Sequence, residues 1–219
     1  MADHQILIVG GGAAGIATAA SLHKRDASLD IAIIEPSTTH YYQPGWTMVG
    51  AGVFKKEETA RSTASVMPSY VTQIRGTVAS FQPDENSVRL EDGKALTYGS
   101  LVVAAGLKLD WAAIEGLEEA LGRNGVTSNY RYDLAPYTWE LVQKMRGEKA
   151  IFTQPPMPIK CAGAPQKAMY LSCSTWMQVG KIKDIDVSFC NAGPVLFGCA
   201  DYVPPLMEYV DRYGINLDF

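Results

Sequence analysis

The sequence predicts an α/β protein, and three observations support this fold class. Two segments, at residues 5–34 and 149–190, each show the pattern of a buried strand, a helix and a second buried strand. Their strands are short, continuous apolar runs, which is typical of parallel strands covered on both faces. A hairpin pattern at residues 87–98 lies between the two segments. We therefore expect two parallel α/β layers, the first of which contains an inserted β-meander.

The first β-α-β segment begins with an apolar strand at residues 5–9 and ends with a second strand at 31–34. Between them lies Gly-Gly-Gly-Ala-Ala-Gly at 10–15, and a helix is predicted to open at Ile16. The pattern G-x-G-x-x-G between a strand and a helix is typical of Rossmann-like folds that bind dinucleotides. We therefore predict a Rossmann-like domain with a dinucleotide at this turn.

Each glycine of this pattern has a separate expected role. Gly10 permits the tight turn, Gly12 lets a pyrophosphate approach the backbone, and Gly15 lets the helix pack closely on the strand. The N–H groups at the start of the helix add hydrogen-bond donors and a partial positive charge. Glu35 ends the second strand, where its carboxylate is expected to accept hydrogen bonds from both ribose hydroxyls.

The rest of the first domain contains an aromatic segment and the meander. Residues 40–47 are rich in aromatic residues and are marked by proline and glycine, which predicts a loop that can wall a flat ring system. A buried strand at 100–106 ends in Gly106, where the backbone can approach a cofactor closely. Three further strands are predicted before it, at 75–81, 87–90 and 95–98.

The second half of the chain repeats the alternation of strands and helices. Its predicted helices are at 134–145, 166–179 and 204–213. Its predicted strands are at 149–153, 185–190 and 215–219. We place the first Rossmann-like domain at residues 1–128 and a partial second one at residues 129–219.

The turn after the strand at 149–153 differs from a dinucleotide-binding turn. Four prolines fill it, at positions 155, 156, 158 and 165. Because proline lacks a free N–H and the required torsional range, a nicotinamide nucleotide is not expected there. The turn contains Cys161 instead, beside Lys160 and ahead of a helix N-terminus near Lys167, and these features stabilise a reactive thiolate. A redox role is favoured over a purely structural cysteine.

Composition and spacing exclude several other classes. Cys173, Cys190 and Cys199 form no C-x-x-C pair and have no histidine nearby, so we predict no metal site and expect buried small side chains. The net charge of −4 argues against nucleic acid as a partner. No apolar run approaches the roughly 18 residues of a membrane span. The first residues show no signal or transit pattern, so we expect the chain to start in the cytoplasm.

Four runs of residues also resemble a known family. They are YYQPGWTMVGAG at 41–52, STASVMPS at 62–69, SNY at 128–130 and KCAGAPQK at 160–167. These runs closely resemble sulfide:quinone oxidoreductases of the type shared by mitochondria and some bacteria, and the last run is highly specific. The resemblance extends from Ile6 to the last residue. It implies a flavoprotein of the pyridine nucleotide-disulfide oxidoreductase superfamily, in which two Rossmann-like domains hold FAD.

The resemblance implies oxidation of hydrogen sulfide to sulfane sulfur, with two electrons passed through FAD to quinone. Sulfide attacks a disulfide of two cysteines, which leaves a persulfide on one sulfur and a thiolate on the other. The thiolate beside the flavin attacks the isoalloxazine, and the sulfane sulfur leaves to an acceptor. Cys161 matches the cysteine on the flavin side. The positions that match FAD contacts are Ala13 and Ala14 at the pyrophosphate, Glu35 at the ribose, Gln43 at the ring and Val78 at the adenine.

Other parts of the family pattern have no counterpart in this chain, which resembles the N-terminal half of such an enzyme. These parts are the second redox cysteine, the quinone pocket and the amphipathic membrane helices. We therefore expect a truncated chain that is inactive alone, whose full-length form is peripheral to the membrane on its cytoplasmic side and contacts it through the C-terminal part. Two alternatives stay open: an NADH:quinone or disulfide oxidoreductase of the same fold, and a non-catalytic or degenerate FAD-binding module.

Overall fold

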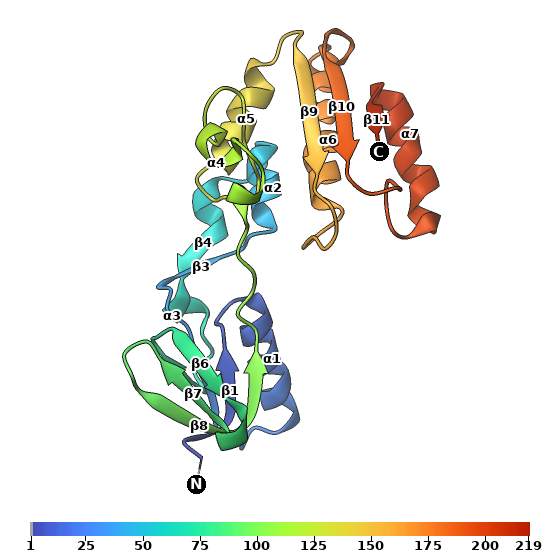
Figure 1. The fold of residues 1–219 in the computed structure, drawn as a ribbon. Coiled ribbons are helices and arrows are strands. Elements are labelled where there is room, and N and C mark those ends of the chain that lie inside the picture. The colour runs from blue at the N-terminus through green and yellow to red at the C-terminus, as the bar shows by residue number, and fades with distance from the viewer. Residues whose placement is uncertain (1) are drawn as a thin grey trace. The chain divides into compact units, whose positions relative to one another are not determined.

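The computed structural model of the protein describes residues 2–219, which form two compact units (Figure 1). The first unit contains the chain up to Tyr42 and returns for Ala60–Ala113. The second unit contains Gln43–Thr59 and Ile114–Phe219. The predicted α/β fold class is confirmed. The units interleave along the chain, so this division differs from the predicted domains at 1–128 and 129–219, which stay a prediction.

The first unit is built on a six-stranded sheet with the order β5-β2-β1-β8-β7-β6. Neighbours among β5, β2, β1 and β8 pair in parallel, whereas β8, β7 and β6 pair as an antiparallel meander. This is the expected parallel layer with an inserted meander. The strands are β1 (His4–Val9), β2 (Ile31–Ile34), β5 (Val71–Ile74), β6 (Val78–Gln82), β7 (Ser87–Leu90) and β8 (Ala95–Val103).

The strands predicted at 95–98 and 100–106 form one continuous strand, β8. Its first half pairs with β7, and from Tyr98 onwards it pairs with β1. Gly99 permits this change of partner, because a Cβ at that position would lie 2.9 Å from the backbone oxygen of Gln5 in β1. The strand predicted at 75–81 begins later, as β6, and is separate from β5.

Burial on both faces of the parallel layer explains its continuous apolar runs. Leu7 and Ile8 of β1 are both fully buried and belong to different clusters. Leu7 packs with Val88 and Leu96 of the meander. Ile8 packs with Ala19 of helix α1 (Ala13–Arg25), which lies beside β1 (Figure 1). Successive residues of a buried strand therefore need apolar side chains in both directions.

Residues 40–47 were predicted as a loop, but they contain two short elements. Strand β3 (Thr39–Tyr41) pairs in antiparallel fashion with β4 (Ala60–Ser62), and helix α3 (Thr63–Val66) follows β4. Helix α2 (Gly45–Gly50) begins within the aromatic segment. The 3-10 helices of the described chain are η1 (Lys56–Thr59), η2 (Pro83–Glu85), η3 (Trp111–Ala113), η4 (Ile182–Asp184) and η5 (Ala200–Tyr202).

The second unit contains a three-stranded parallel sheet with the order β11-β10-β9. Its core joins Met169, Cys173 and Trp176 of α6 to Val187 and Phe189 of β10. Helix α6 begins two residues earlier than predicted. The strands are β9 (Lys149–Gln154), β10 (Asp186–Asn191) and β11 (Asn216–Asp218). The remaining helices are α4 (Leu117–Ala120), α5 (Ala135–Lys144), α6 (Ala164–Gln178) and α7 (Val203–Tyr213).

Close packing of α2 explains why residues 43–59 belong to the second unit. Trp46 and Val49 of α2 form a buried cluster with Ala135 of α5. A Cβ on Gly50 would lie 2.3 Å from the side-chain oxygen of Asn129, and a Cβ on Gly52 would lie 2.3 Å from the ring of Trp139. Glycine at these two positions therefore lets the segment approach residues 129–139 closely.

Candidate functional site

The glycine-rich turn joins β1 to α1 in the first unit. Gly10 has a φ of +107°, and a Cβ there would lie 2.3 Å from the carbonyl oxygen of Ala104. A Cβ on Gly15 would lie 1.9 Å from the carbonyl oxygen of Gly10. A Cβ on Gly12 would meet no atom within 4 Å. The fold itself thus requires glycine at positions 10 and 15, whereas Gly12 borders open space in which a ligand can lie.

The start of α1 is suited to an anion. Gly12 is its N-cap, no side chain caps this end, and its first turn contains no acidic residue. Ala13 and Ala14, in this first turn, are exposed. Because the first N–H groups of a helix have no partner within the helix, they are available as donors alongside the positive end of the helix dipole.

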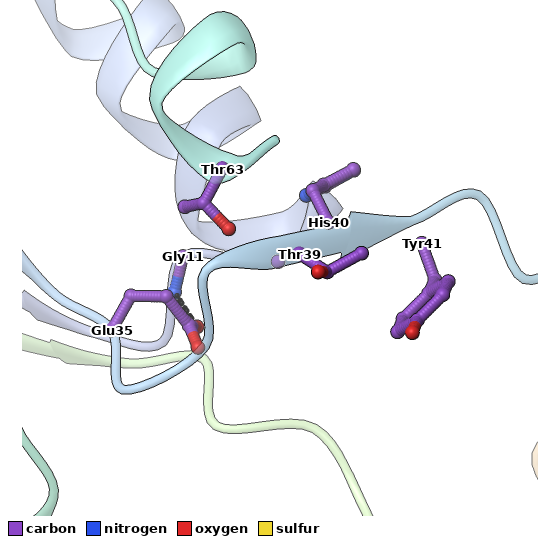
Figure 2. A pocket seen from close by; sticks show the side chains of 7 residues that line it. Gly11, Glu35, Thr39, His40, Tyr41 and Thr63 are labelled. Carbon is purple, nitrogen blue, oxygen red and sulfur yellow. Dashed lines mark hydrogen bonds between the residues drawn. The ribbon is translucent and has the colours of Figure 1, made fainter. Parts of the chain in front are cut away.

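The carboxylate of Glu35 is fixed beside this turn. Its Oε2 accepts a hydrogen bond from the backbone N–H of Gly11 at 2.8 Å, as Figure 2 shows. Its Oε1 accepts one from the backbone N–H of Ser37 at 2.7 Å. An ionised carboxylate offers about four lone-pair directions, so both oxygens retain capacity for a ribose hydroxyl.

A pocket of about 90 Å³ lies at this turn (Figure 2). Thr63 stands in its wall, is 2% exposed, and donates through Oγ1 to the carbonyl oxygen of Ser37 at 2.9 Å. This bond ties α3 to the segment after Glu35. Of the lining residues, Gly12 and Glu35 were predicted individually. Gly11, Thr39, His40, Tyr41 and Thr63 were not, although His40 and Tyr41 lie in the aromatic segment 40–47 and Thr63 in the run 62–69. The pocket is lined by Gly11, Gly12, Glu35, Thr39, His40, Tyr41 and Thr63.

Two other predicted contacts also lie in the first unit. Val78 opens β6, pairs with Leu90 and packs partly buried against the meander core. Gly106 follows β8 with a φ of +74°, and a Cβ there would meet no atom within 4 Å. The structure thus gathers the glycine-rich turn and Glu35 around one pocket. Gln43 and Cys161 belong to the second unit.

Cys161 lies in the turn between β9 and α6, as predicted from the sequence. The residue is half-buried, and its carbonyl oxygen accepts a hydrogen bond from the N–H of Ala164 at 3.1 Å. Burial raises the pKa of the nearby Tyr130 hydroxyl, and the negative charge of a Cys161 thiolate raises it further. The Nζ of Lys160 donates a hydrogen bond to Oε1 of Gln43 and lies 5.5 Å from the centre of the Tyr130 ring. Three distant segments therefore meet at Lys160, the residue before this cysteine.

The four cysteines differ in environment, and all are free thiols. Cys173 is fully buried as predicted, and Cys190 is half-buried. Cys199 is exposed, so the prediction of burial is wrong for this residue. It lies just before η5, outside the regular elements that bury apolar side chains. Within residues 2–219, no three His, Cys, Asp or Glu side chains are grouped so that they could hold a metal ion.

The buried thiol of Cys173 predicts a loss of stability at high pH. Burial raises the pKa of Cys173 from 9.0 to about 12. The folded state therefore favours the protonated thiol, and this stabilisation is complete below pH 9 and lost as the pH rises to about 12. We expect the urea midpoint to fall across this window and to fall less steeply in Cys173→Ala. Circular dichroism measures both midpoints at each pH, and parallel slopes would contradict the assignment. Tyr170, whose pKa is raised to about 12 mainly by burial, is present in both proteins and loses only the smaller contribution of Cys173 in the variant.

Glu35→Ala is expected to destabilise the first unit and to weaken the dinucleotide site. The change leaves the N–H group of the buried Gly11 without its acceptor, which costs on the order of 1–3 kcal/mol of folding stability, whereas water can replace the acceptor of the exposed Ser37 N–H. Glu35→Gln retains one acceptor oxygen and is expected to lie between the two proteins. Thermal unfolding tests this order, with the exposed Glu91→Ala as the matched control. Equal unfolding midpoints in Glu35→Ala and Glu91→Ala would contradict it.

Comparison with known proteins identifies the family of this chain. The sequence profile of the pyridine nucleotide-disulphide oxidoreductase family matches residues 4–140. The mitochondrial sulfide:quinone oxidoreductase of Dictyostelium discoideum is 41% identical over 218 residues, which cover 98% of this chain and 48% of that protein. The mouse (Mus musculus) enzyme of the same name is 39% identical over 216 residues, which cover 99% and 48%.

The fold is also that of a solved structure. The X-ray structure of the sulfide:quinone oxidoreductase from the hyperthermophilic bacterium Aquifex aeolicus superposes with a TM-score of 0.81 at 24% sequence identity. The match covers 98% of this chain and 50% of that one. This chain therefore spans about half the length of the curated relatives it matches. None of the helices described between residues 2 and 219 has both the length and the apolar character needed to cross a bilayer.

Proposed function

This chain belongs to the pyridine nucleotide-disulphide oxidoreductase family, and from that premise we propose that it is the FAD-binding and sulfide-reactive half of a sulfide:quinone oxidoreductase. FAD is the cofactor of the family. The observation that supports the proposal most is Cys161, a half-buried thiol in the KCAGAPQK turn of a chain about 40% identical to sulfide:quinone oxidoreductases over nearly its whole length. The activity, substrates and partners of the longer enzyme are part of this proposal.

The residues of the first unit fit FAD. The open space at Gly12 and the donors at Ala13 and Ala14 suit a pyrophosphate, and the anchored Glu35 suits a ribose. The positions of Val78, Gly106 and Gln43 are proposed as further contacts, with Gln43 at the ring and Val78 at the adenine. When bound, FAD supplies a two-electron acceptor that a quinone can reoxidise.

In the proposed chemistry, Cys161 exchanges bonds with sulfide. Hydrosulfide attacks a disulfide between Cys161 and a second cysteine, so one S–S bond breaks as another forms. One cysteine then carries a persulfide, and the other is released as a thiolate, which we assign to Cys161. An acceptor nucleophile removes the outer sulfur, and re-formation of the disulfide releases two electrons and two protons. In total, hydrogen sulfide and quinone become sulfane sulfur and quinol.

The overall reaction requires three partners. Hydrogen sulfide supplies the electrons, a nucleophile accepts the sulfane sulfur, and a quinone accepts two electrons and two protons. Because quinones with isoprenoid tails dissolve in lipid, we also propose that the longer enzyme works at a membrane surface, on the cytoplasmic side. The second cysteine is proposed to lie in the part of the longer enzyme that this chain does not match.

The proposed function is tested in a chimera in which residues 2–219 replace the matching part of the mouse enzyme. Quinone reduction is followed with sulfide or with NADH as the electron donor. We expect reduction with sulfide and none with NADH, because the prolines at 155, 156 and 158 leave no cradle for a second dinucleotide. Reduction with NADH alone would overturn the proposal and favour an NADH:quinone oxidoreductase. A chimera that binds no FAD would favour a degenerate module.

A further inference from the structure

Thr63 makes two hydrogen bonds to the segment that follows Glu35. Its backbone N–H donates to the carbonyl oxygen of Thr38 at 2.9 Å, and its Oγ1 donates to the carbonyl oxygen of Ser37 at 2.9 Å. The residue is 2% exposed, and it lines the same pocket as Glu35 (Figure 2). All four residues lie in the first unit, so these contacts are internal to one compact body.

The segment that receives these bonds has no regular structure of its own. Residues 35–38 lie between β2 and β3, and Ser37 and Thr38 are exposed. Exposed carbonyl groups bond to water nearly as well as to protein, so they do not by themselves fix the path of the chain. The two bonds from the buried Thr63 therefore restrain a segment that would otherwise sample many backbone conformations.

Ser37 connects Thr63 to the Glu35 carboxylate. The backbone N–H of Ser37 donates to Oε1 of Glu35 at 2.7 Å, while its carbonyl oxygen accepts the bond from Thr63. Oε2 of the same carboxylate accepts a bond from the N–H of Gly11 at 2.8 Å. A series of contacts therefore leads from the buried hydroxyl of Thr63, through Ser37, to the carboxylate beside the glycine-rich turn.

Ser37 also holds the first residue of β3, which forms another part of the pocket wall. Its Oγ donates to the carbonyl oxygen of Thr39 at 2.8 Å and accepts a bond from the N–H of Thr39 at 3.1 Å. Thr39 lines the pocket. Thr63 thus supports both the Glu35 carboxylate and the start of β3. A site that is ordered before its ligand arrives loses less conformational entropy on binding.

We propose that Thr63 is a positioning residue of the dinucleotide site, which holds residues 37–39 so that the Glu35 carboxylate and the β3 wall are in place before the ribose binds. The inference rests on the proposed function in taking this pocket as the ribose site of FAD. Thr63 acts through Ser37 and Glu35, so its role requires no contact with the cofactor.

The first test measures amide hydrogen exchange by NMR in the 219-residue chain without FAD. Thr63→Val removes the hydroxyl and keeps both the shape of the side chain and the backbone N–H. We expect the Ser37 amide to exchange about threefold to tenfold faster in this variant, the effect of losing one hydrogen bond of ordinary strength. Thr63→Ala is expected to give the same result. Thr63→Ser restores the hydroxyl and is expected to show the wild-type rate.

Thr59→Val is the matched control. Thr59 is also 2% exposed, and its Oγ1 donates to the carbonyl oxygen of Lys56 at 2.6 Å. It belongs to the second unit and does not line the pocket. Thr59→Val therefore removes an equally buried hydroxyl and is expected to leave both the Ser37 exchange rate and the FAD affinity unchanged. Thermal unfolding checks that each variant is folded.

The second test measures the FAD affinity of the chimera by the quenching of flavin fluorescence. We expect Thr63→Val to bind FAD about threefold to tenfold more weakly than the wild-type sequence, and Thr63→Ser to bind it equally well. Because Thr63 acts through Glu35, adding Thr63→Val to Glu35→Ala is expected to weaken binding by less than about twofold further.

Several results would overturn the proposal. They are an unchanged Ser37 exchange rate in Thr63→Val, equal changes in Thr59→Val, and faster exchange with wild-type FAD affinity. Fully additive effects of Thr63→Val and Glu35→Ala would also overturn it, because Thr63 would then act independently of the carboxylate. The exchange test uses no FAD. A chimera that binds no FAD would therefore contradict the proposed function, while the exchange rates still decide whether Thr63 holds residues 37–39.

Discussion

Cys161→Ser is expected to lower sulfide-dependent quinone reduction by the chimera by at least about 10³-fold, the scale seen when a covalent nucleophile is removed. Serine cannot form the disulfide that sulfide attacks, and its hydroxyl is not ionised at neutral pH. The measured quantity is the rate of quinone reduction at saturating sulfide. The loss should appear in this rate and leave FAD binding intact, since the change alters neither the glycine-rich turn nor Glu35.

The matched controls are two other cysteines of the same unit. Cys199→Ser changes an exposed thiol and Cys190→Ser a half-buried one, and both variants are expected to retain activity within about twofold. The visible flavin spectrum of each protein shows whether FAD is bound. Turnover by Cys161→Ser at the wild-type rate, with FAD bound, would remove Cys161 from the mechanism.

Gly15→Ala and Gly12→Ala are expected to have different effects, the first on folding stability and the second on FAD affinity. A Cβ on Gly15 would lie 1.9 Å from the carbonyl oxygen of Gly10, so the backbone must move, at a cost of about 1–3 kcal/mol or more. A Cβ on Gly12 meets no protein atom within 4 Å, and its φ of −72° suits alanine. We therefore expect Gly12→Ala to fold normally and to bind FAD at least about tenfold more weakly, because its methyl group enters the space assigned to the pyrophosphate.

Thermal unfolding without FAD and titration with FAD separate the two effects. Gly15→Ala should lower the unfolding midpoint, whereas Gly12→Ala should keep it. Gly93→Ala changes a glycine of the hairpin turn with a φ of +88°, so it should lower the unfolding midpoint and leave FAD binding unchanged. Wild-type FAD affinity in Gly12→Ala would contradict the placement of the pyrophosphate at this turn.

Much of the fold could be predicted because its signals are local. The apolar runs of β1 and β2 and the glycines between them fall within a single β-α-β segment, where spacing alone indicates the structure. The continuity of β8 could not be predicted, because the need for glycine at position 99 comes from its close contact with Gln5 of the neighbouring strand. The same holds for α2, whose Gly50 and Gly52 approach residues 129–139 of a distant segment.

In the candidate site, too, the local features could be predicted from the sequence and the contacts between distant segments could not. Gly10, Gly15 and Glu35 are adjacent to secondary-structure boundaries, so their roles follow from position. Cys161 stands out locally because prolines replace the glycines of an ordinary turn. The contact of Lys160 with Gln43 and Tyr130 joins three segments, and sequence spacing carries no signal of it.

The proposed transfer of electrons from sulfide to FAD through Cys161 is tested by mixing the FAD-loaded chimera with sulfide alone, without oxygen or quinone. The visible absorption of the flavin is recorded for the wild-type sequence and for Cys161→Ser, and NADH is tested in a parallel sample. We expect sulfide to bleach the flavin of the wild-type protein and to leave the flavin of Cys161→Ser oxidised, and we expect NADH to bleach neither. Equal bleaching of both proteins by sulfide, or bleaching by NADH and not by sulfide, would contradict it.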